Sequence, residues 1–214
     1  MSIVRRVAVV TLVLALIATG TALAGRFDPR RKLIPADQAR AAAMVLRTAD
    51  LGPGYSPLPG PSIPAPQTCA ALDESDLTLT GERFAPSWTS SKSFVVTVAR
   101  VYASVSDADR AWALETSRVG IQCRAAPPGR APGTVSRLAF PSLAPRTVAF
   151  RTRYVANVGG SRTKLVADVI LLQRGRGRVS FAIVTPATSP PSRALEFRLA
   201  RIVAARQAKA MHGA

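Results

Sequence analysis

The pattern of apolar and polar positions predicts a helix at the start of the folded part of the chain. Val45 and Leu46 lie on one side of an alanine-rich segment that begins with Pro35, a residue favoured in the first helical turn. We expect this helix to cover residues 35–49. Residues 51–68 follow with six prolines and three glycines, which exclude a helix or an interior strand and predict an extended loop.

Two strands and a second helix are predicted next. Residues 81–104 favour two strands joined by a turn, because apolar side chains alternate from Phe94 onwards. Ser106 as N-cap, with Asp109 three residues later, matches the reciprocal capping pattern and predicts a helix over residues 106–120. The side chains expected on its buried stripe are Ala108, Ala111, Trp112, Glu115 and Val119.

Three further strands and a closing helix complete the pattern. Residues 146–158, 161–173 and 178–185 have strand-like apolar runs, joined by Gly159-Gly160 and by a second glycine-containing turn. A final helix follows two prolines, with Leu195, Leu199, Ile202 and Val203 expected inward and Arg193, Arg201 and Lys209 outward. The order α-β-β-α-β-β-β-α predicts an α+β fold, an antiparallel β-sheet packed against helices in an α/β sandwich.

The second of these turns, Arg174-Gly175-Arg176-Gly177-Arg178, has two interpretations. It could be an RG box that binds nucleic acid, or a basic turn between two strands. RG boxes that bind RNA belong to long disordered tracts, whereas this one is five residues between two apolar runs. Both glycines suit a tight turn. We therefore expect a hairpin and no nucleic-acid partner.

Residues 1–24 have the features of a secretory signal peptide. Arg5 and Arg6 precede an apolar run, and Ala22-Leu23-Ala24 supplies the small-x-small cleavage pattern. An uncleaved membrane anchor is the alternative, because residues 7–24 are just long enough to span a bilayer. We expect cleavage after Ala24, a membrane contact that is only transient, and an extracytoplasmic protein. The rest is expected to form a flexible basic tether (25–34), one monomeric domain (35–209) and a frayed tail (210–214).

Composition adds a strong positive charge and a redox argument. The chain has 29 basic and 12 acidic residues, and losing residues 1–24, with two arginines, lowers the formal charge from +17 to +15. Only four of the basic residues are lysines, so part of this charge reflects an arginine-rich composition. Cys69 and Cys123 are the only cysteines, and in an oxidising compartment we expect them to form a disulfide, with two free buried thiols as the alternative.

The residues that most enzymes need are scarce. His212 is the only histidine and lies three residues from the chain end, where it cannot be held in a packed triad. The chain has no phosphate-binding glycine motif and no metal-ligand spacing, so we expect no cofactor and no metal. A glycosidase mechanism with a pair of carboxylates remains an alternative, although nothing in the sequence identifies such a pair.

Asp168 is the one charged residue in the apolar run from Leu165 to Leu172. A carboxylate there must be exposed at an edge, paired with an arginine such as Arg153 or Arg178, or part of a ligand cleft. Asp168, Arg153 and Arg178 are therefore the candidate cleft residues. Arg151 and Arg153 have the same strand parity, and a basic surface is expected on the closing hairpins from Arg151, Arg162, Arg174 and Arg176.

Two blocks resemble the PknH-like extracellular sensor domains of actinobacteria. Residues 94–123 (FVVTVARVYASVSDADRAWALETSRVGIQC) are similar to their strand, capped helix and terminal cysteine, and residues 168–207 to their closing hairpin and final helix. The resemblance implies a sandwich related to PsbP-like lipoproteins, a structural disulfide, and a cleft for an unidentified extracellular ligand. The kinase-attached members carry four cysteines, whereas this chain has two and no kinase domain.

These features together lead to a functional expectation. We expect an exported, non-catalytic, sensor-like domain that binds a small extracellular ligand or an anionic envelope component. A carboxylate-based hydrolase acting on envelope polymer is the alternative from another class, and a structural adaptor for a second envelope protein is the third.

Overall fold

The computed structural model describes residues 25–58, 69–125, 133–158 and 160–213. The predicted signal peptide, most of the predicted loop at residues 51–68, residues 126–132, Gly159 and residue 214 lie outside these residues. The described chain forms a nine-stranded, mostly antiparallel sheet with helices on both faces, which confirms the predicted α+β class.

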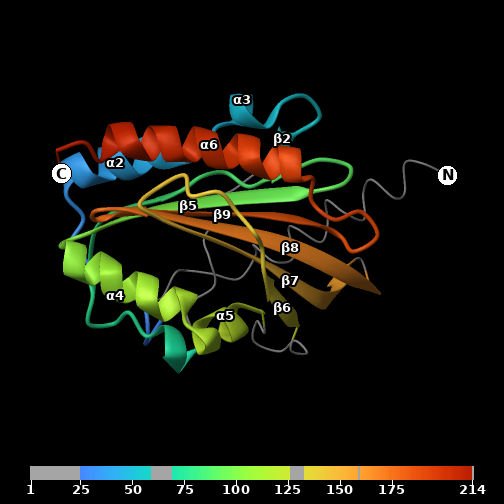
Figure 1. Ribbon diagram of the computed structural model, residues 1–214, viewed down its shortest axis with the longest axis horizontal. Helices are drawn as coiled ribbons and strands as arrows, with labels where there is room; N and C mark the ends of the chain where they lie inside the picture. Colours follow the sequence, from blue (N-terminus) through green and yellow to red (C-terminus); the bar gives the residue numbers. More distant parts are fainter. Residues whose placement is uncertain (1–24, 59–68, 126–132, 159, 214) are drawn as a thin grey trace.

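Helices form a layer on each side of the sheet (Figure 1). On one face lie α2 (Pro35–Met44), the short α3 (Thr48–Leu51) and the closing helix α6 (Arg193–Ala210). On the other face lie α4 (Val105–Thr116) and α5 (Arg118–Ala125). A 3₁₀ turn, η1 (Ala70–Leu72), contacts α4 and α5 on that second face.

The strands are joined in the order β1-β3-β5-β9-β8-β7-β6, and the short β4 pairs with both β5 and β2. Every described pairing is antiparallel except that of β1 with β3. The strands are β1 Arg30–Arg31, β2 Ser56–Pro57, β3 Thr78–Phe84, β4 Trp88–Thr89, β5 Phe94–Tyr102, β6 Thr134–Arg137, β7 Arg146–Val158, β8 Ser161–Arg174 and β9 Gly177–Pro186.

The main core lies between the sheet and the α2–α6 layer. Val95 and Ala99 of β5 are buried there together with Phe181 and Ile183 of β9, as the predicted alternation requires. A smaller cluster on the opposite face joins Tyr102, Leu77 and Leu79 to two alanines of α4, Ala108 and Ala111. The strand periodicity is therefore confirmed on both faces.

The first helix is shorter than the sequence predicts. α2 ends at Met44, and the backbone of Val45 is extended, with φ −75° and ψ 159°. Val45 and Leu46 are buried in the main core from this extended segment, and Trp88 donates a hydrogen bond to Thr48 at 3.1 Å where α3 begins. Core packing therefore favours an extended backbone where the sequence predicts the last turn of the helix.

The second helix begins two residues earlier than predicted. Ser104, not Ser106, is the N-cap, and its hydroxyl accepts a hydrogen bond from the Asp107 N–H at 3.0 Å. The same Ser-x-x-Asp spacing occurs at both positions, and the chain enters the helix directly from β5. The helix also ends at Thr116, so Val119 falls in α5 and is 55% exposed instead of buried.

Residues at both ends of the predicted domain are better anchored than expected. The proposed tether contains β1, and beyond it the Lys32 and Ile34 N–H groups donate to Leu79 and Thr80 carbonyls at 2.8 and 2.9 Å. At the other end, Met211 is 6% exposed and packs against Gly177, where an added Cβ would lie 2.7 Å from the Met211 side chain. Backbone pairing and apolar contact thus order segments that composition alone marked as mobile.

Candidate functional site

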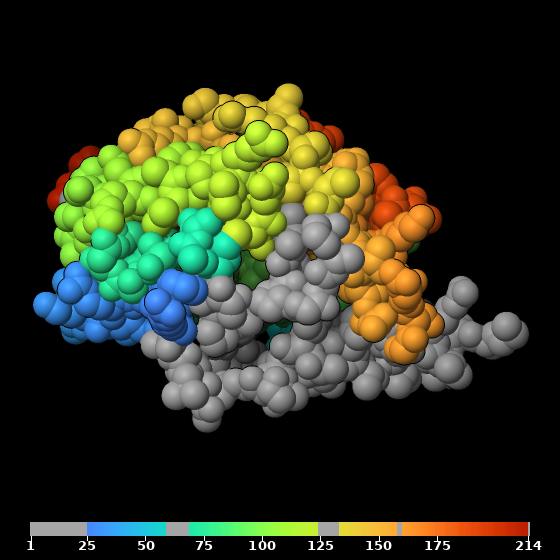
Figure 2. All heavy atoms as spheres, turned by 90° about the horizontal axis from the view of Figure 1, so that it is seen from below, coloured from blue at the N-terminus to red at the C-terminus, as the bar shows by residue number. Residues whose placement is uncertain are grey.

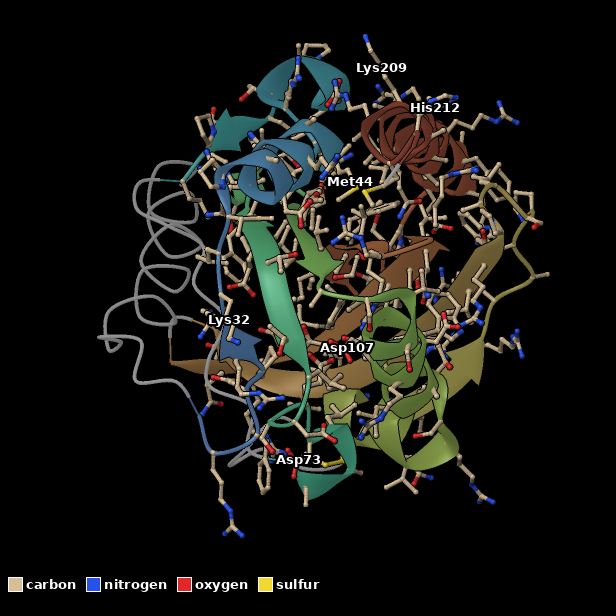
Figure 3. All side chains as sticks on the ribbon, turned by 90° about the vertical axis from the view of Figure 1, so that its left-hand side faces the viewer. Lys32, Met44, Asp73, Asp107, Lys209 and His212 are labelled. Carbon is tan, nitrogen blue, oxygen red and sulfur yellow. A yellow bond between two sulfur atoms is a disulfide. The ribbon has the colours of Figure 1, made fainter. Side chains whose placement is uncertain are left out.

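The predicted disulfide is present. Cys69 and Cys123 are bonded, with their Cα atoms 6.2 Å apart. The bond connects the segment before η1 to α5, and Figure 3 shows its yellow sulfur atoms near Asp73. It closes a loop that contains β3, β4, β5 and α4.

The RG segment is a hairpin turn, as predicted, but its arginines are not a free basic surface. β8 and β9 pair up to Arg174 and Gly177, and Gly175 has a φ of +52°, which favours glycine. Arg176 turns inward, where its Nη1 donates to Asp37 Oδ2 at 3.0 Å and to the Tyr102 carbonyl at 2.8 Å. Through Arg176 and Asp37, the turn therefore connects the start of β9 to the start of α2.

Asp37 is the buried anion that receives this turn. Burial alone would raise its pKa, but hydrogen bonds from Thr80, Arg176 and Arg40 together hold the pKa below its usual value. The helix can approach the sheet here because β3 has Gly81, where an added Cβ would lie 2.2 Å from the Asp37 carbonyl oxygen. This close approach is a structural reason for a glycine at position 81.

Arg178 is also buried, on the opposite face of the sheet from Asp168. It is 5% exposed, forms an ion pair with Glu115, and donates to the Tyr102 hydroxyl at 2.9 Å. Glu74 lies between Arg178 and Arg100, at 3.7 and 3.2 Å. Because Arg100 and Arg178 are direct partners in the β5–β9 register, Glu74 separates two like charges that would otherwise repel across the strands.

Asp168 pairs with Arg151, not with Arg153 or Arg178. Arg151 donates Nε to Oδ1 at 2.7 Å and Nη2 to Oδ2 at 2.6 Å, a bidentate geometry, and Asp168 is fully buried. This hydrogen bonding raises the pKa of Arg151. Arg153 lies two pairs further along the hairpin and is exposed. The three candidate cleft residues are therefore not brought together.

A second buried carboxyl, Glu196, faces Asp168. Glu196 is in the first turn of α6 and has no exposed surface. Burial, followed by a shared hydrogen bond with the Asp168 carboxyl, raises the pKa of Glu196 to about 7, although Arg193 partly offsets the effect. No N–H or O–H group of the described residues donates to Glu196 Oε1. Two ionised carboxyl groups can only accept hydrogen bonds, so a hydrogen bond between Asp168 and Glu196 would require a proton on one of them.

Glu196 was not predicted from the sequence, although its spacing along the helix carried a signal. Glu196 precedes Leu199 and Val203 at helical intervals, so it lies on the buried stripe of α6. Arg193, expected to point outward, bends back over this region: it forms an ion pair with Glu196 and donates to the Ala139 carbonyl. Its guanidinium also stacks on Phe140 and on Phe197, 4.6 Å from the latter ring centre.

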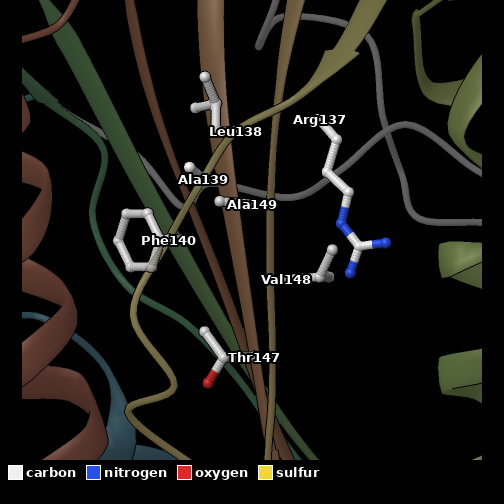
Figure 4. A pocket seen from close by; sticks show the side chains of 7 residues that line it. All are labelled: Arg137, Leu138, Ala139, Phe140, Thr147, Val148 and Ala149. Carbon is white, nitrogen blue, oxygen red and sulfur yellow. The ribbon is translucent and has the colours of Figure 1, made fainter.

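A cavity of about 430 Å³ lies nearby at the β6–β7 edge (Figure 4). Arg137 is its only charged lining residue, and the others are Leu138, Ala139, Phe140, Thr147, Val148 and Ala149. None of the residues predicted to bind a ligand lines it. It contains no pair of facing carboxylates, and Asp168 and Glu196 are both fully buried.

The exposed basic side chains of the closing hairpins differ from the predicted set. Arg151 and Arg176 form ion pairs with buried aspartates, and Arg174 is only half-exposed. On the distal part of the β7–β8 hairpin, by contrast, Arg153, Arg162 and Lys164 are all exposed. Within the part of the chain that the structure describes, none of these three forms an ion pair. We call them the hairpin cations.

The Asp168–Glu196 pair predicts an unusual pH dependence of stability. The folded pKa of Glu196 lies above its ordinary value of 4.5, so the folded state binds a proton that the unfolded state releases between about pH 4.5 and 7. Stability should therefore fall as pH rises through this window, by about 3 kcal/mol for the isolated effect. Glu196→Gln should be the more stable protein at pH 8 by a similar amount, measured by urea unfolding at pH 5 and pH 8.

Asp76→Asn is the matched control, because the Asp76 side chain is 53% exposed and, among the described residues, its carboxylate pairs only with a surface arginine, Arg110. It should keep the pH dependence of the unaltered protein. Equal pH profiles for the unaltered protein and Glu196→Gln would contradict the assignment of the proton to this pair.

Among the described residues, no group of three or more His, Cys, Asp or Glu side chains is arranged like metal ligands. None of the helices in that part of the chain is long and apolar enough to cross a membrane. His212 is exposed just beyond α6, as expected for a residue outside any packed site (Figure 3). In comparisons with known proteins, neither a protein-family model nor a curated protein sequence matches this chain.

Proposed function

We propose that this chain is an exported, sensor-like binding domain that associates with an anionic component of the cell envelope. The signal-like residues 1–24, the Cys69–Cys123 disulfide and the resemblance to PknH-like sensor domains support an extracytoplasmic location. In this function the protein is non-catalytic and needs no cofactor.

The hairpin cations are the observation that carries this proposal. The mature chain has a formal charge of +15, yet the arginines nearest the buried acids are neutralised in ion pairs. Arg153, Arg162 and Lys164 keep their charge at the surface. A cluster of unneutralised cations attracts polyanions and raises their local concentration.

The alternatives receive less support from the geometry. A small-ligand cleft built on Asp168, Arg153 and Arg178 would need side chains from both faces of the sheet, because Arg178 lies on the face opposite Asp168 and Arg153. A carboxylate-based hydrolase would need two accessible carboxyl groups, whereas Asp168 and Glu196 are both fully buried. No described contact points to a particular protein partner for the adaptor hypothesis.

The mature protein should bind purified anionic wall polymer at low salt and lose that binding at about 0.5 M salt, where screening shortens to a few ångströms. Co-sedimentation with the polymer at both salt concentrations measures this. An uncharged polysaccharide is the matched control ligand and should not bind. Absence of binding at low salt, or binding that is insensitive to salt, would falsify the proposal.

A further inference from the structure

We propose that the hairpin cations form a linear docking site for a phosphodiester polymer, with one phosphate beside each cation. This inference rests on the proposed function and names the surface and the partner chemistry within it. The site consists of Arg153 on β7 and of Arg162 and Lys164 on β8.

The strand register places the three side chains on one face of the hairpin. Arg162 and Lys164 are two residues apart on β8, so they project from the same face at a spacing of about 6.7 Å. Val155 pairs with Lys164, and Arg153 pairs with Val166, so Arg153 is the diagonal neighbour of Lys164 at about 7–8 Å. The three cations therefore form a single row at nearly even intervals.

Nothing on this part of the hairpin opposes their charge. The segment from Arg153 to Ala167 contains no aspartate or glutamate, and the next acid, Asp168, is neutralised by Arg151. This contrasts with the other end of the sheet, where Arg176 and Arg178 are paired with buried acids. The positive field thus remains at the end of the molecule that the hairpin forms, the orange projection at the right of Figure 2.

The row favours a linear polyanion over a lipid surface. Successive phosphates of a phosphodiester chain are separated by one sugar or polyol unit, a repeat of the same order as the strand spacing. A bilayer presents its charges in a plane and is held more firmly where apolar side chains can insert. The large exposed apolar residues of the described chain are Leu33, Ile34, Val105 and Val119, and none lies on the hairpin.

The test uses the full mature chain and a synthetic glycerol-phosphate oligomer, with the binding constant measured across a series of salt concentrations. Each phosphate neutralised on a flexible single chain contributes about 0.7 to the slope of log K against log salt. The variant R153Q/R162Q/K164Q should therefore reduce that slope by about 2. The single variants R162Q and K164Q should each reduce it by about 0.7.

The matched control, K32Q/R83Q/R201Q, removes the same charge from three exposed positions outside the hairpin, none in a described ion pair. It should retain most of the slope. Thermal unfolding should show all variants folded, since surface substitutions of this kind usually change stability by within about 0.5 kcal/mol.

Each outcome separates this inference from the proposed function. Equal losses in the hairpin and control variants would mean that the charge acts diffusely, which overturns the docking row but leaves envelope binding intact. Hairpin-dependent binding to phosphatidylglycerol vesicles without binding to the oligomer would overturn the partner chemistry. If the unaltered protein binds neither probe at low salt, the proposed function fails together with the inference.

Discussion

Replacing Arg178 with leucine is expected to lower the free energy of unfolding by about 3–5 kcal/mol. Arg178 is 5% exposed, and it compensates Glu115 and Glu74, which are 4% and 5% exposed. Removing the cation takes positive charge away from both buried carboxylates, although Glu74 keeps its ion pair with Arg100, and reduced compensation of a buried charge is costly. Urea unfolding at neutral pH would measure the loss, with an unchanged m-value showing that the folded and unfolded states keep their compactness.

Arg153→Leu is the matched control, because Arg153 is a strand arginine that is exposed and has no ion pair among the described residues. It should change stability by less than about 0.5 kcal/mol. The double variant R178L/E115L should lose less than the two single variants added together, because it removes both members of the pair. A loss below about 1 kcal/mol in R178L would show that the two glutamates are stable without this arginine.

Removing the disulfide by C69S/C123S is expected to cost about 4 kcal/mol. The bond joins residues 54 apart in sequence, and the chain-entropy model gives this magnitude for a loop of that length. The loop contains β3 and β5, so the unfolded chain without the bond gains freedom over a large part of the domain. Denaturant unfolding of the oxidised protein, the reduced protein and the double serine variant would compare the three.

The reduced protein and the double variant should unfold at similar denaturant concentrations, which separates the effect of the bond from that of the serine side chains. A matching stability of the oxidised and reduced proteins would contradict the prediction. Recovery of two alkylated cysteines from the native secreted chain would show that the bond does not form there, and it would weaken the argument for an oxidising compartment.

Several parts of the fold could be predicted because local patterns carry them. The alternation in Phe94–Tyr102 and the glycine at Gly175 correctly predicted a strand and a hairpin turn. Helix ends were predicted less well: Val45 and Leu46 leave the helix because the core accepts them in an extended segment. Local propensity is weak enough for packing to override it at such positions.

The partner of Asp168 could have been predicted but was missed. A two-residue turn that pairs Val158 with Ser161 also sets Asp168 opposite Arg151, so the predicted hairpin already contained the register. Strand parity alone places both Arg151 and Arg153 on the same face as Asp168, so it does not show which of the two pairs with Asp168. The contact of Glu196 with Asp168 was beyond such reasoning, because it depends on where α6 crosses the sheet.

The sequence by itself determined the order of the main helices and strands, the alternation of buried faces, the disulfide pairing and the overall positive charge, but not the short β1, β2 and β6 or the break between α4 and α5. Only the tertiary structure decided which arginines are neutralised: Arg151, Arg176 and Arg178 have acidic partners, whereas Arg153 and Arg162 remain exposed. The physical reason is that periodicity depends on neighbouring residues, while an ion pair needs atoms within about 4 Å. Asp37 and Arg176 lie 139 positions apart, and folding alone brings them to that distance.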